Sequence, residues 1–319
     1  MTNQKLKLWT GIGVATLLAS SGAIADEHKS RHQDDMMKSA SQGGEGGEGG
    51  EQHGGEGGEQ LGGEGGENHG GEGGEQHGGE AGAAFSYFAA GGEGGEGGEG
   101  GEGGSVSAVE SDGAYVAMLN MMQGHLMAAR ELIKAGKAAE GRPHLTHPWV
   151  EVYPMAEAGL ESRGQEELGN RLKVLAEHAG EVEAWGDTSQ EFQAAWVAIE
   201  KAAKSVGGQS AASVSNVVLS LTTQAVLEYD EALENERFVA DHEYQDGRGF
   251  VMAARAYLDS QQAMLKQKNK EAWRDAGEAL DELQKAWPTA VPPEQPVISV
   301  ANLYAAQARL ELALAPYLY

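Results

Sequence analysis

Residues 115–136 read YVAMLNMMQGHLMAARELIKAG, and this stretch indicates the fold class of the chain. Its apolar residues recur every three or four positions, which places them on one face of a helix. The stripe consists of Tyr115, Leu119, Met122, Leu126, Ala129 and Ile133. Gly136 follows the last apolar turn and predicts the end of the helix, because glycine leaves the helical conformation easily.

The same period continues along the rest of the sequence and predicts an all-α body over residues 105–319. Further apolar stripes lie within 168–182, 192–199, 214–225, 250–258 and 273–287, and a last helix is expected from Ile298 to Ala313. We expect these helices to pack as antiparallel bundles with short connections. Gly207 and Gly208 either divide the body into two bundles, 105–206 and 209–319, or join parts of one.

The first 25 residues have the layout of a cleavable secretory signal. Lys5 and Lys7 precede a short apolar run, and Ala23-Ile24-Ala25 supplies a small-x-small cleavage site. We therefore expect cleavage near Ala25, a periplasmic location and no membrane insertion of the mature chain. The alternative is that this segment is retained as an N-terminal anchor.

Residues 26–104 are dominated by a Gly-Gly-Glu repeat. Such a segment buries too little apolar surface to offset its backbone entropy, so we expect a disordered acidic tail. The repeat is interrupted at residues 83–90 by AAFSYFAA, which is either a short apolar contact patch or a neutral interruption.

Composition narrows the classes of function. The net charge of -26 argues against nucleic acid as a partner, and the absence of cysteine excludes disulfides and thiolate chemistry. The sequence contains no P-loop, nucleophile elbow, zinc-protease motif or dinucleotide fingerprint, so we do not expect an enzyme. A metal-binding or metal-delivery protein remains, and so does a non-metal interaction module with the tail as an acidic tether.

The histidines of the body favour the metal-binding hypothesis. His125 follows Met121 and Met122 on one helix face, and the segment after Gly136 reads PHLTHPWVEVY. His125 and His147 are equidistant from Gly136, so an ideal antiparallel hairpin would bring them to the same height. Glu151 follows His147 by one helical turn. We therefore predict a metal site; its candidate ligands are His125, His147, Glu151, Met121, Met122 and His144.

Methionine, histidine and carboxylate ligands suit copper, iron or zinc, and the methionines favour copper. We take iron or copper as the candidates and zinc as the least favoured. The alternative is that His125 is a hydrogen-bonded core residue and that residues 144–148 only begin a helix. For His178, beside the stripe at 168–182, we expect a core position.

A second stretch carries a resemblance to a known family. Residues 226–250, VLEYDEALENERFVADHEYQDGRGF, resemble the periplasmic N-terminal domain of bacterial high-affinity iron permeases. The shared positions are Tyr229, Ala232, Val239, Glu243, Tyr244, Asp246 and Phe250. The permease's membrane helices with their Arg-Glu-x-x-Glu motifs are missing, so transport itself is not implied. The resemblance implies a soluble periplasmic component that handles metal, with iron favoured, and a membrane metal transporter as its partner. Elsewhere the sequence is similar to uncharacterised exported proteobacterial helical proteins with Gly-Glu tracts.

Overall fold

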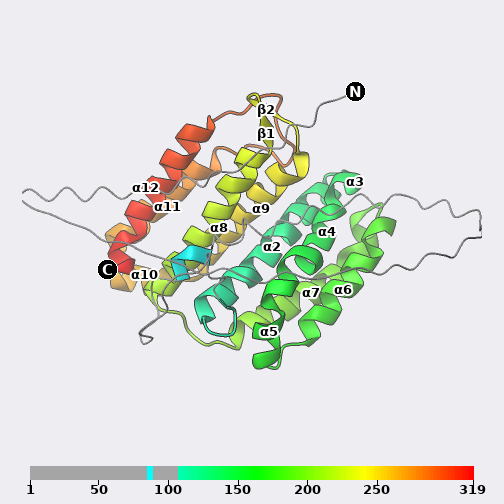
Figure 1. Ribbon diagram of the computed structural model, residues 1–319, viewed down its shortest axis with the longest axis horizontal. Coiled ribbons are helices and arrows are strands. Elements are labelled where there is room, and N and C mark those ends of the chain that lie inside the picture. Colours follow the sequence, from blue (N-terminus) through cyan, green and yellow to red (C-terminus); the bar gives the residue numbers. More distant parts are fainter. Residues whose placement is uncertain (1–84, 89–106) are drawn as a thin grey trace, which may run out of the picture. The chain divides into compact units, whose positions relative to one another are not determined.

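A computed structural model describes residues 85–88 and 107–319, and its described part is almost entirely helical (Figure 1). The elements are α2 (Asp112–Lys134), α3 (Ala138–Gly141), α4 (Pro143–His147), the π-helix η1 (Pro148–Val152), α5 (Tyr153–Ser162), α6 (Glu167–His178), the 3-10 helix η2 (Ala179–Glu181), α7 (Trp185–Lys204), α8 (Ala211–Glu231), β1 (Leu233–Glu234), β2 (Arg237–Phe238), α9 (Asp241–Ser260), α10 (Gln262–Lys268), α11 (Lys270–Gln284) and α12 (Val300–Leu318). The all-α prediction is confirmed.

The predicted signal segment 1–25 and nearly all of the predicted tail 26–104 lie outside the described residues. Residues 85–88, within the apolar interruption of the repeat, form a single helical turn. Phe85 is buried there, and the hydroxyl groups of Tyr87 and Thr223 lie 3.3 Å apart.

Helix α2 forms where the apolar stripe predicts it. Ser111 caps its N-terminus by accepting a hydrogen bond from the Ala114 N–H, and Gly136 follows its C-terminus with a φ of 78°. Every residue of the predicted stripe is at most 2 % exposed. The helix is buried on nearly all sides, because it packs against α7, α3 and α4 on one side and against α8 and α9 on the other (Figure 1).

Four long helices, α8, α9, α11 and α12, form a bundle in the C-terminal half. Helix α8 packs on α9 and α12, and α11 packs on α12 and α9. The interior includes the buried rings of Tyr229 and Trp287, whose centroids lie 5.2 Å apart in an edge-to-face arrangement. Helix α12 extends beyond the expected end at Ala313, because Pro316 is accommodated in its last turn.

An antiparallel hairpin with two residues in each strand connects α8 to α9. The sequence pattern did not predict this hairpin. Its turn residues Asn235 and Glu236 both have positive φ, as a tight hairpin turn requires. The turn reverses the chain, so α9 returns along α8. Among the described helices, none combines the length and the apolar character needed to cross a membrane.

Candidate metal centre

Three histidines and one aspartate converge where α2, α4 and α9 meet. His125 belongs to α2, His144 and His147 belong to α4, and Asp246 belongs to α9. One nitrogen from each imidazole and one carboxylate oxygen all lie within 4.8 Å of one another. We call these four residues the histidine–aspartate cluster.

A close crossing of α2 and α9 brings His125 to Asp246. Gly124 immediately precedes His125, and Gly249 lies three residues after Asp246. A Cβ on Gly249 would collide with the carbonyl oxygen of Gly124, and a Cβ on Gly124 would lie 2.7 Å from a ring carbon of Phe250. The two glycines therefore set the separation of the helices at the cluster.

The Nδ1 atoms of the three histidines point at one carboxylate. Nδ1 of His125 lies 2.5 Å from Oδ1 of Asp246, and Nδ1 of His144 lies 2.7 Å from the same oxygen. Nδ1 of His147 lies 2.9 Å from Oδ2. An ionised carboxylate only accepts hydrogen bonds, so each Nδ1 carries the proton in the metal-free protein.

The opposite nitrogens of the same rings face acceptors outside the cluster. Nε2 of His144 lies 2.7 Å from Oε1 of Gln245. Nε2 of His125 and Nε2 of His147 lie 3.6 and 3.7 Å from the two carboxylate oxygens of Glu151. Outer acceptors of this kind fix the ring orientation of metal-binding histidines. Here the hydrogen bond to Gln245 orients the ring of His144, and the carboxylate of Glu151 attracts the rings of His125 and His147.

The π-helix η1 carries Glu151 to this position. Pro148 has no N–H, so the usual bond back to the carbonyl of His144 cannot form. The ladder instead widens, and the N–H of Tyr153 bonds to the carbonyl of Pro148 five residues earlier. Single π-turns of this type occur frequently at functional sites.

Burial and charge act against each other in the cluster. Burial alone raises the pKa of Asp246, but the charges of His125, His144 and His147 outweigh it and hold this pKa well below its usual range. Burial lowers the pKa of His144, but the charge of Asp246 and the hydrogen bonds to Asp246 and Gln245 raise it above its ordinary value. The cluster therefore holds an ionised aspartate at which three imidazole rings point.

The cluster can supply three imidazole nitrogens and one carboxylate oxygen to an ion. Metal binding displaces protons from histidine, so the same Nδ1 atoms that donate to Asp246 would become ligands. Imidazole and carboxylate together suit iron, zinc or copper. His125, His144 and Asp246 are at most 3 % exposed, whereas the side chains of His147 and Glu151 are 15 % and 34 % exposed. The cluster therefore opens to solvent at His147 and Glu151.

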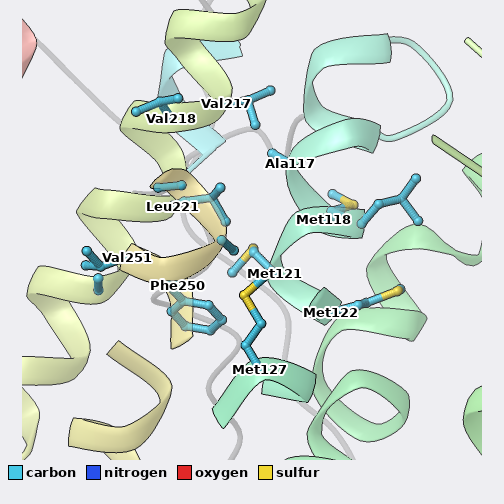
Figure 2. Close-up of a cluster of buried hydrophobic side chains, with 14 of the residues drawn as sticks. Ala117, Met118, Met121, Met122, Met127, Val217, Val218, Leu221, Phe250 and Val251 are labelled. Atoms are coloured by element: carbon cyan, nitrogen blue, oxygen red, sulfur yellow. The ribbon is translucent and has the colours of Figure 1, made fainter. Parts of the chain in front are cut away.

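The structure brings together four of the six residues proposed from the sequence. His125, His144 and His147 converge directly, and Glu151 contacts two of them on their outer sides. Met121 and Met122 lie in the buried apolar core (Figure 2). The ligand atoms that converge are nitrogen and oxygen, so the cluster itself does not carry the sulfur that favoured copper.

Sequence reasoning did not propose Asp246, although it is the residue that the histidines surround. The available signal was its place in the permease-like stretch, three residues after Glu243 and four before Phe250. The ring of Phe250 packs edge-on against that of His125, with centroids 4.8 Å apart.

His178 was predicted to be a core residue, and this prediction was wrong: its side chain is 55 % exposed and its Nδ1 lies 2.6 Å from Oε1 of Glu191.

No curated protein and no solved structure gives a significant match to the chain. His125, His144 and His147 lie before the segment that matches a family model. Residues 207–316, which include Asp246 and all of α8, α9, α11 and most of α12, match the family model of the iron permease-associated 4-helix bundle domain, as the resemblance at residues 226–250 predicted.

Proposed function

We propose that this chain is a periplasmic metal-binding protein that holds iron at the histidine–aspartate cluster and delivers it to a membrane iron transporter. The observation that carries the proposal is the orientation of the three rings. Each Nδ1 faces Asp246, and each Nε2 faces Glu151 or Gln245. Histidines that bind a metal usually show this division between an inner ligand nitrogen and an outer acceptor.

Iron is favoured by the match of residues 207–316 to an iron permease-associated domain. Three imidazoles and a carboxylate suit ferrous iron, and copper is the second candidate because imidazole binds it more tightly in general. Delivery is favoured over catalysis by the same match, because the matching domain is one associated with iron permeases. The periplasmic location is supported by the signal-like residues 1–25. Cell fractionation and N-terminal sequencing test it, and we expect a mature chain that begins at Asp26.

The test of the metal site uses the full chain, purified without a histidine tag. The tail contains His53, His69 and His77 among many glutamates and can bind metal weakly, so affinities are compared between variants that all retain the tail. Ferrous iron is titrated anaerobically, and cupric and zinc ions are titrated separately, each against a chromophoric chelator. Metal content of the protein as isolated from cells identifies the ion that is bound there.

Asp246→Asn keeps the shape of the side chain and removes the charge, and His144→Ala removes one ligand. We expect each to weaken binding by more than the 10–100-fold typical of an outer partner. His178→Ala is the matched control, because His178 is exposed and pairs only with Glu191 among its described contacts. Unchanged affinity in both cluster variants would refute the site and would favour the interaction module with an acidic tether.

A further inference from the structure

His242 lies beside the histidine–aspartate cluster without belonging to it. It is the second residue of α9 and precedes Asp246 by one helical turn, so the two side chains are neighbours on one face of that helix. The ring of His242 packs edge to face with that of His144, and the two centroids lie 5.9 Å apart. His144 is completely buried, whereas His242 is exposed to solvent. The cluster therefore has a further imidazole next to it at the protein surface.

Together the four imidazole rings form a continuous series from the core to the surface. The ring centroids of His125 and His147 lie 5.1 Å apart, and those of His147 and His144 also lie 5.1 Å apart. The contact between His144 and His242 continues the series outward. A metal–imidazole bond is roughly 2.0–2.1 Å long, so rings at these separations are close enough to hold one ion between them or to exchange it.

Burial of the ligands restricts how an ion reaches them. His125, His144 and Asp246 are at most 3 % exposed, so none of them can be the first to meet a hydrated ion or the partner that accepts the ion. Exposed side chains change rotamer on the picosecond to nanosecond timescale. His242 can therefore turn outward to bind an ion and turn back toward Asp246, its neighbour on the same face of α9.

We propose that His242 is the entry and exit ligand of the histidine–aspartate cluster, which binds the ion at the surface and exchanges it with Asp246 and the buried imidazoles. The inference rests on the proposed function, because it assigns the route by which that centre is loaded and emptied. The step is a ligand exchange: the bond between the ion and His242 breaks as bonds to the cluster form, and no electron is transferred. Protons displaced from the cluster imidazoles leave to solvent.

A residue on the route of an ion changes rates, whereas a resident ligand changes affinity. The dissociation constant is the ratio of the release rate constant to the loading rate constant. Loss of an entry ligand therefore slows loading and release by the same factor and leaves the dissociation constant unchanged. Loss of a resident ligand speeds release instead, so kinetics distinguish the two roles.

The measurement uses the full chain, purified without a histidine tag, and cobaltous ion as a coloured substitute for ferrous iron. Loading is followed by stopped-flow absorbance, release is followed after addition of excess chelator, and an equilibrium titration gives the dissociation constant. We expect His242→Ala to slow loading and release by the same factor. His178→Ala is the matched control, since it removes another exposed histidine, and it should leave both rates unchanged.

The variant His242→Glu tests whether the side chain acts by binding the ion. A carboxylate also binds these metals, so both rates should recover toward those of the wild type. If His242→Glu were as slow as His242→Ala, the ring of His242 would act by packing against His144, and the proposed role would be overturned.

Three other results would overturn the inference and leave the proposed function intact. Unchanged rates in His242→Ala would place entry at His147 and Glu151. Faster release with unchanged loading would make His242 a resident ligand, and faster loading together with faster release would mean that its ring covers the route. Failure of the proposed function is recognised separately: if Asp246→Asn leaves the affinity unchanged, the cluster binds no metal and both proposals fall.

Discussion

The substitution Gly249→Ala tests whether the glycine crossing of α2 and α9 positions the cluster. A Cβ at this site would collide with the carbonyl oxygen of Gly124 and would lie 2.8 Å from its carbonyl carbon, whereas ordinary contact begins at 3.4 Å. Both atoms belong to the backbone, so no side chain can rotate away. The helices must therefore separate locally by more than half an ångström.

The expected loss of stability follows from two opposing effects. Overpacking costs about 1–3 kcal/mol, and a backbone clash belongs at the upper end of this range. The higher helix propensity of alanine offsets about 1 kcal/mol of this cost, so the free energy of unfolding should fall by about 2 kcal/mol. For a folded body of this size, the melting temperature should fall by about 4–8 °C. Separation of the helices should also break the contact between His125 and Asp246, so affinity for ferrous iron should fall as well.

The assay is urea unfolding of the metal-free protein followed by circular dichroism, with the iron titration performed in parallel. Gly186→Ala is the matched control, because Gly186 lies in α7 and a Cβ there would meet nothing within 4 Å. The control should be neutral or stabilised by up to about 1 kcal/mol. A Gly249→Ala protein as stable as the wild type, with unchanged affinity for iron, would show that the crossing does not position the cluster.

Three further predictions follow from other contacts. Glu151→Gln should weaken ferrous iron binding by roughly 10–100-fold in the chelator competition, because Glu151 acts from outside the ligand set; unchanged affinity would contradict that role. Arg248→Met should lower the free energy of unfolding by roughly 1–3 kcal/mol, because it leaves Glu131 and the carbonyl of Trp287 without their donor. The control is Arg274→Met, at a side chain 58 % exposed, which should change the free energy of unfolding by less than about 0.5 kcal/mol. Equal losses in the two variants would contradict the role given to Arg248. The hydrogen bond and charge of Glu191 raise the pKa of His178 above its ordinary value. The contribution of this pair to stability is therefore present at low pH and is lost as pH rises through that raised pKa. In Glu191→Gln, an NMR titration should show the pKa of His178 shifted back toward 6.5, and an unchanged pKa would exclude the pairing.

Helical periodicity predicted the body correctly because it is a local property. The stripe from Tyr115 to Ile133 is buried as expected, and Gly136 follows the end of its helix. The same stripe misled the reasoning about metal ligands, since methionines at helical spacing pack in a core as readily as they bind an ion. Met121 and Met122 occupy such core positions.

Other parts of the site depend on contacts that no local pattern encodes. Asp246 is 121 residues from His125 in sequence and reaches it only because α9 crosses α2. The hairpin argument about Gly136 assumed one continuous second helix. The chain instead forms α3, α4 and η1, because Pro143 begins one helix and Pro148 widens the next. His178 was assigned to the core because it adjoins an apolar stripe, but its ring turns outward to Glu191.

The histidine–aspartate cluster is assembled from two parts of the chain with different relations to known proteins. Its aspartate lies inside the segment that matches the iron permease-associated bundle, and its three histidines lie before it. A protein that possessed only the bundle would have this carboxylate without the imidazoles of His125, His144 and His147. The centre proposed here therefore needs residues from both segments. It depends on the joining of residues 107–206 to the bundle, and an ion bound there would cross-link the two segments, so that pulling them apart and releasing the metal would be one event.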